Sequence, residues 1–149
     1  MFTIHFFAEM ATQKISGNHK VLFGDIDGTF PNHHPNPVDP ETLAILRKAV
    51  ADAGADLGIG FDGDGDRIGI VDAKGRQVPG DFLTAFLARD MLARHAGATV
   101  ILDVKSSDMA MALIAAAGGD AQIWKTGHSH MKTRMAEINA PLAGEISGH

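Results

Sequence analysis

The chain has 149 residues, and its 13 Lys and Arg against 18 Asp and Glu give a formal net charge of −5. With 45% hydrophobic and 21% charged residues, its composition is that of a globular chain with a buried core rather than a disordered one. The acidic balance excludes the basic surface expected of a protein that binds nucleic acid or an anionic membrane. The chain has no Cys, which excludes disulfides and thiolate metal ligands.

No apolar run approaches the roughly 20 residues of a membrane span, and the first residues lack the basic segment of a signal peptide. We therefore expect a cytoplasmic protein with no nucleic-acid or membrane partner. Residues 1–20 show neither helical nor strand periodicity, so they are predicted to be a leader of undetermined structure.

The first predicted element is a short strand over residues 21–23, followed by DIDGTF and then by PNHHPNP. Three prolines in seven residues exclude a helix or a sheet ladder there, so this segment is predicted to be an extended loop. From residue 40 apolar residues recur at helical spacing. Asp39 is the predicted N-cap of that helix and Gly54 its predicted C-terminal stop.

Two predicted strands, over residues 57–61 and 68–71, enclose the acidic run DGDGDR, and residues 72–75 predict a turn. We place a domain boundary after this turn. The predicted organisation is the leader over 1–20, a partial domain with the acidic loop over 21–75, and a second domain over 76–149.

The second domain alternates predicted helices, over 81–95, 107–117 and 130–138, with predicted strands, over 99–104, 121–125 and 142–145. This alternation is typical of a parallel sheet with right-handed crossovers. The predicted fold class is therefore α/β, a parallel or mixed sheet with helices on both faces. The sequence stops directly after the last strand, so we expect a truncated domain.

The strongest chemical signal is DGDGDR, in which Asp62, Asp64 and Asp66 alternate with glycines. Such a loop can direct three carboxylates at one hard cation, at oxygen distances of about 2.0 to 2.6 Å. A solvated acidic turn is the plain alternative, but three neighbouring anions repel one another without a cation. A calcium hand requires Gly at position six and Glu at position twelve, where Arg67 and Ala73 stand. Because an arginine beside a metal suits phosphoryl transfer, we expect Mg²⁺ and a phosphorylated ligand.

The segment around Asp25 and Asp27 offers a rival interpretation. DIDGT after an apolar stretch resembles the first motif of the haloacid dehalogenase-like phosphatases, in which the first Asp is the nucleophile and the second the acid/base. That family continues with an apolar stretch and a helix, whereas FPNHHP follows here.

Four further segments carry polar groups suited to a site. His33 and His34, with Asn32 and Asn36, are candidate metal ligands, but adjacent His side chains point to opposite sides of an extended chain, so loop-fixing hydrogen bonds are favoured over metal binding. Lys105 follows a predicted parallel strand, at the edge where open α/β sheets bind ligands; a solvated lysine is the alternative. The runs TGHSH (126–130) and GEISGH (144–149) also lie at strand ends and can bind an anion or a polyol, although a plain helix cap explains the first equally well.

In this order, FPNHHPNP, DGDGDR, DVK, KTGHS and GEISGH resemble the α-D-phosphohexomutase family, specifically its phosphomannomutase/phosphoglucomutase branch. The resemblance covers roughly residues 23–149. Members have four domains, and this chain resembles the end of the second and most of the third. The missing domains of the parent enzyme are therefore possible partners.

The resemblance implies a reversible shift of phosphate between the 1- and 6-positions of a hexose through a bisphosphorylated sugar. It assigns Mg²⁺ to Asp62, Asp64 and Asp66. Its implied catalytic residues are Arg67, Lys105 and His128, and its implied residues for binding the hexose phosphate are Glu145, Ser147 and His149. The glucosamine-phosphate branch usually has Gln where Ile146 stands, so mannose or glucose phosphate is favoured.

The departures from the family pattern concern the phosphoryl donor. No segment resembles the Ser-His-Asn-Pro phosphoserine loop of the first domain or the phosphate-binding loop of the fourth. Relatives also often carry a basic residue at the position of Asp108. We therefore expect this chain alone to have no mutase turnover, and a non-catalytic module that binds Mg²⁺ or a sugar phosphate stays open as an alternative.

Overall fold

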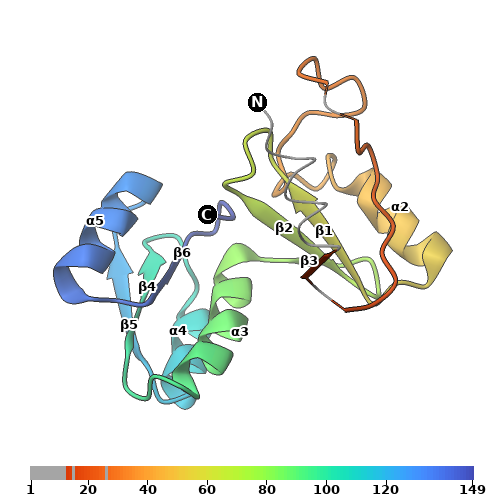
Figure 1. The fold of residues 1–149 in the computed structure, drawn as a ribbon. Helices are drawn as coiled ribbons and strands as arrows, with labels where there is room; N and C mark the ends of the chain where they lie inside the picture. Colours follow the sequence, from red (N-terminus) through yellow and green to blue (C-terminus); the bar gives the residue numbers. More distant parts are fainter. Residues whose placement is uncertain (1–12, 15, 26) are drawn as a thin grey trace. The chain divides into compact units, whose positions relative to one another are not determined.

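The computed structural model describes residues 13–14, 16–25 and 27–149, so most of the predicted leader lies outside the described residues. The chain divides into two compact units, Met1–Gln77 (unit 1) and Val78–His149 (unit 2), which are described separately (Figure 1). Over the residues described, no helix is long and apolar enough to cross a membrane.

Unit 1 contains helix α2 (Ala44–Ala53) and a three-stranded sheet in the order β1-β2-β3, formed by Leu57–Phe61, Ile68–Asp72 and Gln77–Val78. β1 and β2 are antiparallel, with Leu57 opposite Asp72 and Phe61 opposite Ile68. The acidic loop is therefore the connection of a hairpin, as predicted.

The core of unit 1 lies between α2 and the sheet. Leu43, Val50 and Val71 are buried there, and Leu46 and Ala55 pack against them. The prediction that Gly54 ends the helix is confirmed, because Gly54 adopts the left-handed conformation with φ 58°.

Two local predictions for unit 1 are wrong. Residues 21–23 form no strand, because Phe23 has φ 53°, which breaks an extended run. Asp39 does not cap α2, since the helix begins at Ala44 and the Asp39 carboxylate instead accepts a hydrogen bond from the Glu41 N–H at 2.9 Å. The second error arises because a turn formed by a side-chain hydrogen bond competes with the start of the helix.

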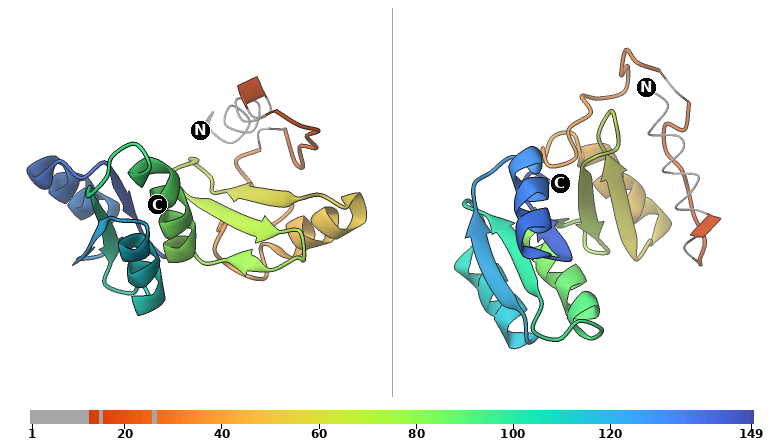
Figure 2. Two further views of the ribbon diagram at one scale, coloured as in Figure 1. Left: turned by 90° about the horizontal axis from the view of Figure 1, so that it is seen from below. Right: turned by 60° about the vertical axis from the view of Figure 1, so that its left-hand side comes forward.

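Unit 2 has the predicted parallel sheet, in the order β5-β4-β6. Its elements in chain order are α3 (Gly80–Leu92), β4 (Thr99–Asp103), α4 (Asp108–Ala116), β5 (Asp120–Trp124), α5 (His128–Ile138) and β6 (Leu142–Gly144). The views in Figure 2 show helices on both sides of this sheet.

Alternate residues of the central strand β4 face opposite layers. Val100 and Leu102 lie in one cluster with residues of α3 and α4, and Ile101 lies in another with Met131 of α5. All three β4 residues are fully buried, as expected for a parallel strand covered on both faces. The predicted α/β fold with helices on both faces is thus confirmed for unit 2.

The strand order also locates the ligand-binding edge of unit 2. From β4 the chain passes to β5 on one side and then, through α5, to β6 on the other. Open parallel sheets bind ligands outside the carboxyl ends of the strands where the order reverses. Here that position lies beyond the ends of β4 and β6, next to Asp103 and Glu145.

A buried carboxylate joins the first turns of α3 and α4. Asp81 is 1% exposed, and its Oδ2 accepts hydrogen bonds from the Ser107 N–H at 2.9 Å and the Ser107 hydroxyl at 2.7 Å. The Ser107 oxygen in turn accepts from the Ala110 N–H, which caps α4.

We expect Asp81→Ala to reduce the free energy of unfolding by about 3 kcal/mol, because two buried donors on Ser107 lose their acceptor. Denaturant unfolding followed by the fluorescence of Trp124, the only Trp, measures this effect in unit 2. The control is Asp90→Ala in the same helix, whose side chain is 76% exposed and should cost no more than about 0.5 kcal/mol. Equal losses in both variants would contradict the role of Asp81.

Candidate functional site

In unit 1 the hairpin connection gathers the three predicted metal ligands. One carboxylate oxygen from each of Asp62, Asp64 and Asp66 lies within 4.8 Å of the others. Asp62 comes directly after β1 and is 1% exposed, whereas Asp64 and Asp66 are exposed. The hairpin therefore holds one acid in place and leaves two facing solvent, as an oxygen-ligand site for a hard cation requires.

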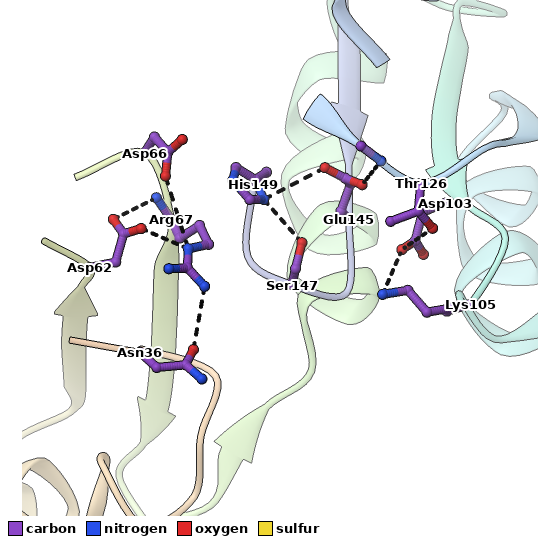
Figure 3. A network of polar contacts seen from close by, with 11 residues as sticks. Asn36, Asp62, Asp66, Arg67, Asp103, Lys105, Thr126, Glu145, Ser147 and His149 are labelled. Carbon is purple, nitrogen blue, oxygen red and sulfur yellow. Dashed lines mark hydrogen bonds and ion pairs between the residues drawn. The ribbon is translucent and has the colours of Figure 1, made fainter. Parts of the chain in front are cut away.

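Arg67 is fixed to the buried acid (Figure 3). Its Nε donates to Asp62 Oδ2 at 2.7 Å and its backbone N–H donates to Asp62 Oδ1 at 3.1 Å. Nη1 lies 3.5 Å from Asn36 Oδ1, and Asp66 Oδ1 is 4.0 Å from Nε. A carboxylate has about four acceptor positions, so Asp62 keeps free lone pairs while it orients the guanidinium.

Burial raises the pKa of the Asp62 carboxyl, but the hydrogen bonds from the Arg67 side chain and backbone outweigh burial and lower the pKa below 3.8. Asp62 is therefore an anion at neutral pH. An anionic carboxylate beside two further acids is the protonation state that a divalent cation needs.

The proline-rich loop contacts Arg67 and the third strand of the unit 1 sheet. Asn36 contacts Arg67, and the Gln77 amide donates to the Val38 carbonyl at 2.8 Å. His33 Nδ1 lies 3.0 Å from the His34 carbonyl oxygen, a contact within the loop. The contact between Asn36 and Arg67 was not predicted, because nothing in a single sequence shows which arginine an asparagine meets 31 residues away.

In unit 2 the carboxyl end of β4 carries an acid that sequence analysis also missed. Asp103 is 0% exposed; its Oδ1 accepts from the Ser106 hydroxyl at 2.9 Å, and its Oδ2 lies 3.4 Å from Thr126 Oγ1 and 3.7 Å from Lys105 Nζ. The sequence signal for this acid was a single charged residue at the end of an otherwise apolar strand. Lys105 itself has a 53% exposed side chain, so its ammonium group is accessible.

The second buried acid at this edge is Glu145, which follows β6. Its Oε1 accepts from the Gly127 N–H at 2.6 Å, and its Oε2 is buried, with His149 Nδ1 at 3.6 Å. The 126–127 turn between β5 and α5 is therefore held by Asp103 through Thr126 and by Glu145 through Gly127. One oxygen of Glu145 is thus committed to the turn, and the other, Oε2, is a buried acceptor that has no hydrogen-bond partner among the described residues.

The last six residues form a closed loop in which the other predicted sugar ligands meet. The Glu145 N–H donates to the His149 carbonyl and the Gly148 N–H to the Glu145 carbonyl, both at 3.0 Å. Ser147 Oγ and His149 Nδ1 share a hydrogen bond of 3.0 Å, and the rings of His128 and His149 meet edge to face at 5.3 Å. Predicted residues from two separate motifs thus lie together at this edge.

The base of this loop is packed against α3. A Cβ on Gly144 would lie only 1.8 Å from Thr84 Oγ1, and the Thr84 hydroxyl is fixed by donating to the Gly80 carbonyl at 2.8 Å. Glycine is therefore required for the strand to approach the helix, and this contact fixes where the loop begins.

Comparison with known proteins identifies the family to which both units belong. Residues 6–75 match the family model of phosphoglucomutase/phosphomannomutase, alpha/beta/alpha domain II, and residues 79–149 match the model of alpha/beta/alpha domain III. The chain belongs to the phosphoglucomutase/phosphomannomutase family. The first matched range contains the acidic loop, and the second contains the loops at the sheet edge of unit 2.

Individual relatives agree with the family assignment. The chain is 49% identical over 128 residues to a phosphomannomutase/phosphoglucomutase of Pseudomonas putida and 46% identical over 128 residues to a phosphoglucomutase of Neisseria meningitidis. A solved phosphoglucomutase/phosphomannomutase family protein from Burkholderia thailandensis is 44% identical, with a TM-score of 0.82. Each match covers 86% of this chain and 28% of the relative, so the chain spans about a quarter of their length.

The family assignment leaves the phosphatase hypothesis without structural support. Residues 16–24, which directly precede Asp25, form no strand. Asp27 is exposed and accepts hydrogen bonds from the Thr29 N–H at 2.9 Å and the Thr29 hydroxyl at 2.7 Å. These contacts place Asp27, the acid/base in that hypothesis, in a local turn.

Proposed function

We propose that this chain supplies the metal-binding and sugar-binding parts of a phosphohexomutase, which interconverts the 1-phosphate and the 6-phosphate of mannose or glucose through a bisphosphorylated sugar. Family membership and the two clusters of polar residues support the proposal. The relatives include both a phosphomannomutase/phosphoglucomutase and a phosphoglucomutase, which is consistent with either hexose.

The observation that carries the proposal is the convergence of three carboxylate oxygens within 4.8 Å beside a fixed arginine. Carboxylates are the hard oxygen ligands that Mg²⁺ prefers, so the donors present fit this ion. Asp62, Asp64 and Asp66 would hold it. When bound, Mg²⁺ neutralises charge on phosphate oxygens and thereby favours displacement at phosphorus.

In the proposed function, the side chains of this chain bind the hexose phosphate and orient it. Arg67, held by Asp62, offers its remaining N–H groups to phosphate oxygens. Lys105 supplies a positive charge or a proton, with His128 nearby on α5. Glu145 Oε2 and Ser147 Oγ accept hydrogen bonds from sugar hydroxyls, and His149 supports their loop through its contacts with both residues.

The first test is Mg²⁺ binding by the full 149-residue chain, measured by calorimetry. We expect Asp64→Asn to weaken Mg²⁺ affinity at least tenfold with little loss of stability, because Asp64 is exposed and contributes a charge to the site. Saturating wild type at about 100 times the dissociation constant should add about 2.7 kcal/mol of stability, which Asp64→Asn reduces.

The matched control is Asp52→Asn, which also removes one exposed charge from unit 1 but lies on α2 in an ion pair with Lys48. This variant should bind Mg²⁺ like the wild type. Equal loss of affinity in both variants would show only a general effect of charge, and no Mg²⁺ binding at all would refute the metal site.

Turnover separates the proposal from the phosphatase alternative. The sequence contains no Ser-His-Asn-Pro run, so we propose that the isolated chain does not isomerise mannose 1-phosphate. Hydrolysis of a generic phosphate ester that is lost in Asp25→Asn but kept in Asp62→Asn would instead support the phosphatase. Tight binding of a sugar phosphate without turnover is expected both of a mutase portion and of a non-catalytic binding module.

A further inference from the structure

The buried carboxylate of Asp103 has a position that the proposed function does not use. It closes the central strand of unit 2, it is fully buried, and its oxygens contact groups from the two loops that follow β4 and β5. An ionised side chain excluded from water is strongly unfavourable without partners. The groups around the Asp103 carboxylate therefore indicate its role.

Those groups belong to two different segments. The Ser106 hydroxyl and the Lys105 ammonium come from the turn after β4, and the Thr126 hydroxyl comes from the turn after β5. Oδ1 is occupied by Ser106 alone, whereas Oδ2 faces both Lys105 Nζ at 3.7 Å and Thr126 Oγ1 at 3.4 Å (Figure 3). A single oxygen atom thus lies between the exposed cation and the turn that leads to His128.

We propose that Asp103 is a positioning residue that acts through Lys105, holding the ammonium group at the ligand-binding edge of the sheet beside the 126–127 turn. This inference rests on the proposed function, in which Lys105 meets the hexose phosphate. The lysine side chain has four rotatable carbons and is half exposed, so without a fixed counter-charge it would lose orientation. The buried carboxylate is rigid and supplies that counter-charge.

The Asp103 carboxylate also contacts the 126–127 turn. Glu145 holds the Gly127 N–H at 2.6 Å, and Asp103 faces the hydroxyl of the preceding residue, Thr126. The two carboxylates come from adjacent parallel strands, β4 and β6. Neutralising Asp103 therefore weakens its contact with Thr126 and removes the counter-charge of Lys105 at the same time.

The test is a double-mutant cycle on the full chain with Asp103→Asn, Lys105→Met and their combination. The measured quantity is the affinity for glucose 6-phosphate and for mannose 6-phosphate. We expect each single variant to lose about tenfold and the double variant to lose about tenfold as well, because the second change removes an interaction already lost. A loss of about a hundredfold in the double variant would mean that Asp103 acts independently of Lys105 and would overturn the proposal.

A second measurement does not depend on sugar binding. In protein labelled with ¹³C-lysine, Asp103→Asn should shift the Cε resonance of Lys105 and leave that of Lys132 in place, and the control Asp120→Asn should shift neither. An unchanged Lys105 resonance overturns the positioning role. If no variant binds hexose phosphate but the Lys105 resonance shifts, the proposed function fails for this chain while the role of Asp103 stands.

Discussion

Replacing Gly69 with Ala is expected to destabilise unit 1 by about 3 kcal/mol or more, because overpacking against an immovable group is costly. A Cβ at this position would lie 1.9 Å from the Pro37 carbonyl oxygen and 2.8 Å from its carbon. These are backbone atoms of a buried proline, so no change of side-chain rotamer relieves the clash. Either the strand β2 or the proline-rich loop has to move.

Gly69→Ala should also alter the proposed metal site. Asn36 immediately precedes Pro37 and contacts Arg67 at 3.5 Å, and Val38 follows it and accepts a hydrogen bond from Gln77. Displacing the Pro37 carbonyl therefore loosens both contacts that tie the loop to the sheet. We expect weaker Mg²⁺ binding together with faster amide hydrogen exchange in β1 and β2.

Gly60 provides a matched control, since it lies directly opposite Gly69 in the β1-β2 register. A Cβ on Gly60 would meet only side-chain atoms, the nearest 3.4 Å away, which is ordinary contact. Gly60→Ala should therefore unfold within about 1 kcal/mol of the wild type in denaturant. Similar unfolding midpoints for the two variants would contradict the assigned packing of Pro37 on β2.

The elements predictable from sequence were those set by periodicity. The apolar strand at 99–104 and the helices on either side of it have repeating patterns long enough to determine type, and the structure has β4, α3 and α4 there. The acidic loop was also predictable, because alternating Asp and Gly between two apolar runs leaves few other conformations. In each case the information lay within neighbouring residues.

Other features depend on partners distant in sequence. Asp81 meets Ser107, Asp103 meets Thr126 and Asn36 meets Arg67, and in none of these pairs does residue type identify the partner. Glu145 shows the same limit, since its motif suggested a sugar ligand but not that one oxygen is bound by the Gly127 N–H. The sequence therefore indicated which loops carry the chemistry, while tertiary contacts determine which oxygen atoms are available.

The second large effect concerns Asp62, where Asp62→Asn is expected to cost about 3 kcal/mol at neutral pH. Both carboxylate oxygens accept an N–H of Arg67, at 3.1 and 2.7 Å. An amide of the same shape has one acceptor, so its NH₂ group must face one of these donors in either orientation. The hairpin loses a buried acceptor, and Arg67 loses the contact that orients it.

The loss of unfolding free energy in Asp62→Asn should also depend on pH, and it should become smaller as the pH falls. The pKa of Asp62 is lowered in the folded protein from an ordinary value of 3.8, so its charged form contributes stability that is fully present above that value and is lost as the pH falls through the folded pKa. The difference in unfolding free energy between wild type and Asp62→Asn should therefore be constant from pH 7 to about pH 5 and shrink below 3.8.

Urea unfolding at a series of pH values without Mg²⁺ measures this difference, and Asp52→Asn serves as the exposed control from the same unit. If the difference in unfolding free energy stays constant down to pH 2.5, Asn destabilises the hairpin for steric reasons and the Asp62 charge contributes nothing to stability. Repeating the series with Mg²⁺ should widen the gap at neutral pH, because the ion binds the folded wild type more tightly than the variant. The widening should disappear at low pH, since protons and Mg²⁺ compete for the same carboxylates.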